Sequence, residues 1–164
     1  MKLILTKHGQ EIVVDDDIYE QCNNRQWRVD KGGYARNNPW VNGKTVTVYL
    51  HRLVMKADSS KTIVDHINGD KLDNQRSNLR FVTQEQNKFN RKATVGTPCP
   101  YKGVTINSSS KRPYKADIFY RGVHHYLGVF ATAEEAAQAY NEGSLKYHGE
   151  YGRLNVIPVP STAV

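Results

Sequence analysis

Three polar side chains that could act together on a water molecule lie near the middle of the chain. Asp65 and His66 are adjacent, and Asn87 follows after a polar segment. Carboxylate and carboxamide oxygens are ligands for hard divalent cations. An imidazole has a pKa near neutrality and can take a proton from water. These residue types therefore favour metal-assisted hydrolysis, in which a cation and a base act on the same water.

The pattern around these residues predicts two short strands followed by a helix. Residues 63–66 begin with two β-branched residues and end on the Asp-His pair. A turn at 68–70 precedes a second strand at 79–82, because Asn and Gly accept positive φ readily. Thr83 and Gln86 have the spacing of a capping box, which predicts a helix that carries the asparagine. These rigid elements can fold onto one another and bring the polar groups together.

Length and charge limit the classes of protein to consider. The chain has 164 residues, a formal net charge of +7 and a pI of about 9.4. This length allows one domain or two small ones. An excess of basic residues is typical of proteins that bind a polyanion, more often nucleic acid than a membrane surface. A charge that only keeps the protein soluble is an equally frequent explanation.

Cysteine usage and hydropathy indicate the compartment. Cys22 and Cys99 lie far apart and form no C-x-x-C pattern, which argues against a zinc ribbon and a disulfide scaffold. Two free thiols fit a reducing compartment. Polar residues interrupt the first apolar residues too soon for a signal peptide, and no apolar run approaches membrane-spanning length. We therefore expect a soluble, cytoplasmic protein that binds no membrane.

Residues 1–60 predict a small, mostly β region. Aromatic and basic residues alternate within it: Trp27, Tyr34 and Trp40 with Arg25, Arg28 and Arg36. Aromatic rings beside basic groups on a sheet can contact nucleic acid. Burial of the rings in a core is an equally open alternative.

The last third of the chain predicts a separate sheet and helix. Residues 93–100 contain two prolines and a glycine, which predicts a linker. Three strands are expected after it, at 101–106, 114–120 and 124–130. Thr132 and Glu135 then form a capping-box pattern that opens an alanine-rich helix. The end of the chain, 156–164, is expected to be a frayed tail.

Charge is unevenly distributed over this last third. Between residues 101 and 121, five basic residues stand against one acidic residue, whereas between residues 131 and 150 four acidic residues stand against one basic residue. The strands therefore form a basic sheet, and the helix behind them is acidic. Such a sheet, rather than the helix, is expected to face a phosphate backbone.

The middle of the chain resembles the HNH nuclease family. The matching runs are Val64–Asp70, Asp73–Arg80 and Thr83–Asn87, and Leu50–Val54 resembles the segment that leads into this motif in phage-type members. The resemblance implies a ββα-metal fold over residues 61–92. The expected fold class is therefore α+β: this nuclease core, preceded by the β-rich region and followed by a three-stranded antiparallel sheet backed by one helix.

The same resemblance implies a role for each polar residue. His66 would be the general base, and Asp65 and Asn87 would bind the metal through oxygen. Asn78 would hydrogen-bond across the loop and hold His66 in line. A site with so few protein ligands is suitable for Mg²⁺ (or Mn²⁺), and no zinc is expected. His51 is a rival base outside the motif, for which a structural or phosphate-contact role is favoured.

The segment from 101 to 155 resembles the APETALA-two type DNA-binding domain. Tyr101–Val104, Tyr114–Ile118, Tyr126–Phe130 and Thr132–Tyr140 carry this resemblance. In that family the three-stranded sheet lies in the major groove and a helix backs it. This chain has Tyr114 and Tyr126 where plant members have tryptophans, and Thr105, Asn107 and Phe119 at positions of base-reading arginines. Affinity for double-stranded DNA is implied, whereas the plant domain's sequence preference does not transfer.

These patterns together predict a metal-dependent, homing-type HNH endonuclease of phage or mobile-element origin that cleaves double-stranded DNA in the host cytoplasm. The residues expected to contact DNA are Arg28, Arg36, His51, Arg52, Arg80, Arg91, Lys92, Lys102, Arg112, Lys115, Arg121, His124 and Tyr126. A non-catalytic DNA-binding protein with a vestigial nuclease core and an RNA-directed nuclease are the alternatives. A monomer would nick and a homodimer would cut both strands; the sequence does not choose between them.

Overall fold

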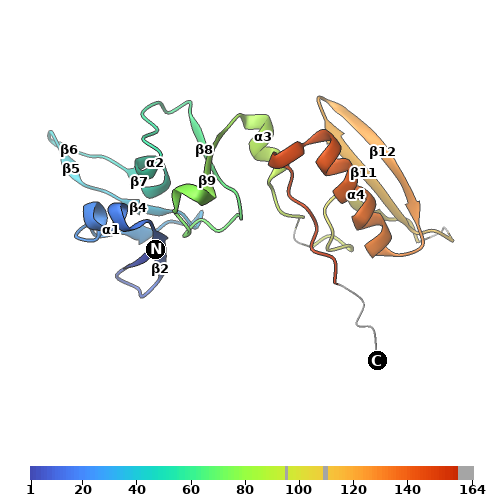
Figure 1. Cartoon of the computed structure of the whole chain (residues 1–164), viewed down its shortest axis with the longest axis horizontal. Helices are drawn as coiled ribbons and strands as arrows, with labels where there is room; N and C mark the ends of the chain where they lie inside the picture. Colours follow the sequence, from blue (N-terminus) through green and yellow to red (C-terminus); the bar gives the residue numbers. More distant parts are fainter. Residues whose placement is uncertain (95, 109–110, 159–164) are drawn as a thin grey trace. The chain divides into compact units, whose positions relative to one another are not determined.

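The computed structural model describes residues 1–94, 96–108 and 111–158 and divides the chain into two compact units, Met1–Asn87 and Lys88–Val164 (Figure 1). The tail expected at 156–164 and the linker expected at 93–100 lie partly outside the described residues. Small antiparallel sheets and a few helices make up both units, which confirms the predicted α+β class. No helix in the described parts of the chain is long and apolar enough to cross a membrane.

The first unit begins with small antiparallel sheets. Strands β1 (Lys2–Leu5) and β2 (Glu11–Val14) form a hairpin, and α1 (Asp16–Cys22) follows it. A three-stranded sheet has the order β3-β4-β7, and a separate hairpin pairs β5 with β6. The bounds of these strands are Arg28–Val29 for β3, Ala35–Asn37 for β4, Trp40–Val41 for β5, Lys44–Thr45 for β6 and Val48–Tyr49 for β7.

The motif predicted in the middle of the chain forms two strands and a helix. After the short helix α2 (Leu50–Val54), β8 (Ile63–His66) pairs antiparallel with β9 (Leu79–Val82), and the 3₁₀ turn η1 (Arg76–Asn78) precedes β9. Helix α3 (Gln84–Phe89) follows. Its predicted capping box is present: the Gln86 N–H donates to Thr83 Oγ1 at 3.1 Å, and the Thr83 N–H donates to Gln86 Oε1 at 2.8 Å.

One core joins the hairpin, the three-stranded sheet and the β8–β9 pair. Its buried residues are Ile4, Ile12, Val14, Ile18, Cys22, Trp27, Ala35, Leu50, Val54, Val64 and Leu79. Trp27 is 1% exposed, and its indole N–H donates to the Cys22 carbonyl at 2.9 Å, whereas Trp40 on β5 is 72% exposed. Burial in the core therefore applies to Trp27, whereas Trp40 lies on the surface, where contact with nucleic acid stays a prediction.

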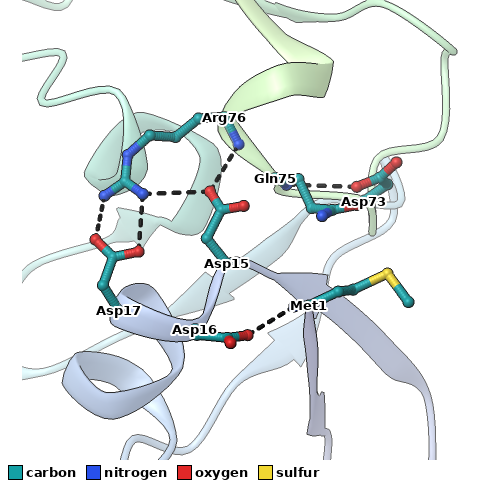
Figure 2. A network of polar contacts seen from close by, with 7 residues as sticks. All are labelled: Met1, Asp15, Asp16, Asp17, Asp73, Gln75 and Arg76. Atoms are coloured by element: carbon teal, nitrogen blue, oxygen red, sulfur yellow. Dashed lines mark hydrogen bonds and ion pairs between the residues drawn. The ribbon is translucent and has the colours of Figure 1, made fainter.

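The loop between β8 and β9 is attached to the N-terminal hairpin. The Val13 N–H donates to the Leu72 carbonyl at 2.9 Å, and the Asn74 N–H donates to the Val13 carbonyl at 2.8 Å. Figure 2 shows a second attachment, in which the Arg76 guanidinium meets both carboxylate oxygens of Asp17 at 2.8 and 2.6 Å. The Arg76 N–H also donates to Asp15 Oδ2 at 3.0 Å. These contacts fix the middle of the loop to β2, and Arg76 near its end to the first residues of α1 and the residue before it.

The second unit has the sheet-and-helix arrangement that the sequence predicts. Strands β10 (Val104–Ile106), β11 (Tyr114–Tyr120) and β12 (Val123–Phe130) form one antiparallel sheet in chain order. Helix α4 (Ala133–Tyr147) packs on it through Ala136 and Ala137, and the 3₁₀ turn η2 (Gly149–Tyr151) follows the helix. Thr132 and Glu135 make the predicted capping box.

Element boundaries in the structure depart from the sequence pattern in three places. Residues 44–49 form two short strands, β6 and β7, because they pair with different partners: β6 with β5 and β7 with β4. The strand expected from residue 101 begins at Val104, since Gly103 has a φ of +72° and ends a turn. Helix α3 ends at Phe89, inside the segment 61–92 that the resemblance assigns to the nuclease motif.

The contrast between the two tryptophans gives a stability test for the first unit. Replacing Trp27 by Ala is expected to lower the free energy of unfolding by about 3–5 kcal/mol, because it removes the largest fully buried side chain. The same change at Trp40 should stay within about 0.5 kcal/mol. Urea denaturation followed by circular dichroism measures both, and equal losses would contradict the assigned core.

Gly103 gives a corresponding test for the second unit. A Cβ at this position would overlap the Tyr140 ring and approach the Asp117 carbonyl to 2.8 Å, at a φ of +72°. Gly103→Ala is therefore expected to cost about 2–4 kcal/mol. Gly122 is the matched control, because its φ is +80° but nothing lies within 4 Å of an added Cβ.

Gly122→Ala should lose only about 1 kcal/mol, the cost of the left-handed backbone alone. Thermal unfolding of the two variants separates close packing from backbone strain. A cost for Gly103→Ala no larger than that for Gly122→Ala would show that Tyr140 does not constrain this turn.

Candidate functional site

Strand β8 ends on two buried polar residues, Asp65 and His66. The register pairs Asp65 with Arg80 on β9, and the Arg80 guanidinium donates to Asp65 Oδ2 from Nε at 3.1 Å and from Nη2 at 3.0 Å. Both side chains are largely shielded from solvent, at 10% and 14% exposure. A buried carboxylate needs a cation and hydrogen-bond donors, and Arg80 supplies both.

The imidazole of His66 is held by an asparagine that sequence reasoning did not single out. His66 Nε2 lies 3.4 Å from Oδ1 of Asn74, which is fully buried. The Asn74 Nδ2 donates to the Lys71 carbonyl at 3.3 Å, so the amide presents its oxygen to the ring. In the neutral ring the proton is then on Nε2 and the lone pair is on Nδ1.

Burial determines the protonation state of this ring. His66 is 3% exposed, and desolvation lowers its pKa below the usual value. The hydrogen bond with Asn74 and the Asp65 carboxylate act in the opposite direction without reversing the shift. At neutral pH the imidazole is therefore uncharged and can accept a proton from a water molecule.

Asn78 organises the loop that follows His66. Its Oδ1 accepts the Asn68 N–H at 3.0 Å, and its Nδ2 donates to Asn68 Oδ1 at 3.0 Å and to the Asp73 carbonyl at 2.8 Å. Its own carbonyl accepts the Ile67 N–H at 2.8 Å. These bonds hold the backbone next to His66, whereas the described contact with the imidazole itself comes from Asn74. The Asp73-Asn74 dipeptide reads as an ordinary polar loop, so only the folded loop identifies Asn74.

Aromatic rings enclose His66 on its other side. The His51 ring from α2 lies 5.2 Å from the His66 ring, and the Tyr34 ring lies 5.2 Å from His51 and 6.0 Å from His66. Tyr49 on β7 adds a ring 5.7 Å from His51. His51 Nδ1 is buried, and residues 1–87 offer it no hydrogen-bond partner. Burial, aided by the nearby His66 and Arg52, lowers the pKa of His51 to about 4.

The oxygen donors expected for a metal are one carboxylate and one carboxamide. Asn87 lies on α3, half-buried, and its N–H donates to the Thr83 carbonyl at 3.0 Å. Among the described residues no three His, Cys, Asp or Glu side chains gather in a metal-binding cluster. The Arg80 guanidinium already pairs with Asp65 Oδ2, so a cation at this carboxylate would share it with Arg80. This donor set fits Mg²⁺, which keeps several of its waters.

Two of the basic residues expected to contact DNA have partners inside the first unit. The Arg52 guanidinium donates to the carbonyls of Thr62, Ala57 and Ser59, at 2.6, 2.9 and 2.7 Å, and so ties together the connector before β8. Arg80 binds Asp65. Arg28 and Arg36 instead line a polar hollow on the β3–β4 sheet.

In the second unit the expected contact residues fall into a half-buried and an exposed group. Lys102 is half-buried and donates from Nζ to the Phe89 carbonyl; its burial, together with Arg153 and Arg91, lowers its pKa to about 8. The exposed group comprises Arg91, Lys92, Arg112, Lys115, Arg121, His124 and Tyr126.

The outer face of the second unit's sheet combines charge with exposed rings. Lys115 and His124 lie 3.3 and 3.4 Å from the Asp117 carboxylate. Phe119 and Tyr126 are both more than half exposed beside them. His124 and its neighbour His125 lie on opposite faces, since His125 stacks on Tyr147 of α4 at 4.4 Å. The pair therefore does not form a metal clamp, as strand alternation predicts.

Comparison with known proteins shows which family and which relatives this chain is similar to. The family described as HNH endonuclease matches residues 48–89, which contain α2, β8, the loop, β9 and α3. An uncharacterized HNH endonuclease of Acanthamoeba polyphaga mimivirus is 34% identical over 154 residues, which cover 91% of this chain and 76% of that protein. The H-N-H endonuclease F-TflII of Escherichia phage T5 is 30% identical over 110 residues, 58% of this chain and 56% of that protein.

A solved structure described as DNA binding and cleavage by the HNH homing endonuclease I-HmuI is 28% identical, with a TM-score of 0.38, and covers 54% of this chain and 56% of that one. The identification rests instead on the mimivirus relative, because its similarity extends over most of both chains. The matched family segment also contains every residue of the Asp65–His66 site described above except Tyr34. The chain belongs to the HNH endonuclease family.

Proposed function

We propose that this protein is a homing-type DNA endonuclease that hydrolyses phosphodiester bonds in double-stranded DNA with a divalent metal, Mg²⁺ or Mn²⁺. The observation that carries the proposal is the buried Asp65–His66 pair at the end of β8, with the imidazole uncharged and oriented by Asn74. A buried neutral histidine beside a carboxylate is suited to take a proton in the presence of a bound cation.

Each residue of the site has a defined part in the proposed reaction. His66 accepts a proton at Nδ1 from the water that attacks phosphorus, as the new P–O bond forms and the bond to the leaving oxygen breaks. Asp65 and Asn87 would hold the cation, which would supply stabilisation of negative charge on the phosphate and the leaving oxygen. Asn78 keeps the loop after β8 closed, which fixes the backbone of His66. Asn74 keeps the proton of the neutral ring on Nε2.

The second unit is proposed to hold the DNA duplex through the outer face of its sheet. Lys115 and Arg121 supply charge for the backbone, and the exposed rings of Phe119 and Tyr126 supply apolar contact with base edges. The acidic residues of the segment lie mainly on α4, behind the sheet. The relatives from a virus and a phage support an origin in such genomes. Action in the host cytoplasm is part of the proposal.

The first prediction concerns the base and the metal. His66→Ala should reduce the rate of duplex cleavage by at least about 100-fold, the usual contribution of a general base. Asp65→Ala and added EDTA should each abolish cleavage, while DNA affinity measured by fluorescence anisotropy changes little. His8→Ala is the control, because His8 is exposed on the β1–β2 turn. Equal cleavage by wild type, His66→Ala and EDTA-treated protein would exclude the proposed reaction.

The second prediction concerns Asn74, whose oxygen faces His66 Nε2. Asn74→Ala should lower the cleavage rate by about 10- to 100-fold, because the ring loses its orienting partner. Asn74→Asp keeps an acceptor and adds negative charge, which raises the pKa of His66. It should therefore restore activity above neutral pH and move the rising limb of the pH profile to higher pH.

The pH profile distinguishes this positioning role from a purely structural one. Circular dichroism checks that both Asn74 variants are folded, since Asn74 is fully buried. Similar pH profiles for wild type and Asn74→Asp would count against the hydrogen bond as the determinant of the ring's protonation.

A further inference from the structure

A polar hollow opens on the three-stranded sheet of the first unit. Its volume is about 190 Å³, and Gln26, Arg28, Arg36, Asn37 and Asn38 line it. A water molecule takes about 30 Å³ in the liquid, so the hollow has room for a group well beyond a single water. Every lining side chain carries hydrogen-bond donors, and none is acidic. The lining therefore suits an anion.

Two arginines lie directly opposite one another in this hollow. The register of β3 and β4 pairs Arg28 with Arg36. Residues opposite one another in an antiparallel pair have Cβ atoms about 5 Å apart, and like charges there destabilise the sheet. Within residues 1–87 neither guanidinium makes an ion pair with a carboxylate, although Asp30 lies near enough for the Arg36 charge to affect it.

Asp30 does not serve as the missing partner, because its oxygens are used elsewhere. Oδ1 accepts the N–H groups of Gly32 and Tyr34 at 2.9 and 3.0 Å, and Oδ2 lies 3.4 Å from the Tyr49 hydroxyl. Asp30 thus closes the turn between β3 and β4. A bound anion would offset the repulsion between the two guanidiniums.

The amides of the lining are arranged around the arginines. The Asn37 Nδ2 donates to the Gln26 carbonyl at 2.7 Å, which joins β4 to the residues before β3 and fixes one wall of the hollow. The Gln26 and Asn38 side chains add further amide donors. Planar guanidinium forks together with neutral amides match the several oxygens of a phosphate group.

The hollow lies close along the chain to the ring cluster around His66. Tyr34, whose ring is 6.0 Å from the His66 ring, precedes Arg36 by two residues. In an extended chain, two residues that are two positions apart are separated by about 7 Å, and their side chains point to the same side. Arg36 is also paired in register with Tyr49, another ring of the same cluster. The hollow is therefore near enough to engage the DNA strand whose bond faces His66.

We infer that the hollow lined by Arg28 and Arg36 binds a backbone phosphate of the DNA, a short distance along the strand from the bond that His66 hydrolyses. This inference rests on the proposed endonuclease function and adds a positioning site to it. The contact carries no base specificity, because it reads phosphate only. It sets the register of the strand over the site.

The test measures DNA binding as a function of salt. Each phosphate contact contributes about 0.9 to the slope of log affinity against log salt concentration for duplex DNA. Because both guanidiniums bind the same phosphate, the double variant is expected to reduce the wild-type slope by about 0.9, and Arg28→Gln and Arg36→Gln by no more than this each. Fluorescence anisotropy with a labelled duplex that wild type cleaves gives these slopes, with EDTA present to stop the reaction.

Two control variants make the comparison specific. Arg25→Gln removes the same charge from an exposed neighbour that does not line the hollow, and should leave the slope unchanged. Arg36→Lys keeps the charge and should retain the slope while losing part of the affinity, since lysine lacks the planar fork. The melting temperature of Arg36→Gln should equal or exceed that of wild type, because like-charge repulsion is removed.

A second arm distinguishes backbone phosphate from free phosphate. The melting temperatures of wild type and the double variant are compared in inorganic phosphate and in chloride at equal ionic strength. One result would overturn the inference: inorganic phosphate stabilises wild type, but wild type and the double variant have the same slope of log DNA affinity against log salt concentration. The hollow would then be a site for free phosphate. An Arg25→Gln effect as large as that of Arg36→Gln would overturn it as well.

Cleavage separates failure of this inference from failure of the proposed function. If wild type cleaves and all slopes are equal, the phosphate site is wrong and the endonuclease function stands. If wild type neither binds nor cleaves duplex DNA, both are wrong. Reduced slopes together with cleavage at displaced or multiple positions by the double variant support the inference.

Discussion

The ion pair between Asp65 and Arg80 is the interaction on which the geometry of the site depends. It joins β8 to β9 one pair before the buried His66 and Leu79, which end the ladder. A slip of one residue would move Asp65 to the other face and leave both charges without partners in a shielded place. Removing one member of a buried pair costs about 3–5 kcal/mol, so the pair strongly favours one register.

This pair also explains why the site presents so few ligands. Arg80 pairs with the carboxylate of Asp65, and the side chains described in contact with the His66 ring are uncharged: Asn74, His51 and Tyr34. The histidine is uncharged because it is buried among such groups. The carboxylates of Asp65, Asp70 and Asp73 still raise the pKa of His66, although burial outweighs them.

The N-terminal β region is part of the same architecture. The loop that contains Asn74 is fixed by two backbone hydrogen bonds to Val13 on β2, and Arg76 is fixed by Asp15 and Asp17. The three-stranded sheet supplies Tyr34 and Tyr49 against the two histidines. These contacts show why a β-β-α motif of some thirty residues does not form such a site alone: its loop needs external surfaces to define it.

The sequence by itself determined the features that depend on local chemistry. Side-chain periodicity and turn residues act over a few positions. They give the strand ends at His66 and Val82, the capping boxes of Thr83 and Thr132, and the sheet of the second unit.

Only the tertiary structure decided which groups meet across long separations. Asn74 reaches His66, Arg80 reaches Asp65, Trp27 enters the core and Trp40 does not, because burial and strand register depend on the packing of distant segments. A pattern in the sequence records which residue types are present, whereas the free energy of desolvating them is set only when the chain has folded around them.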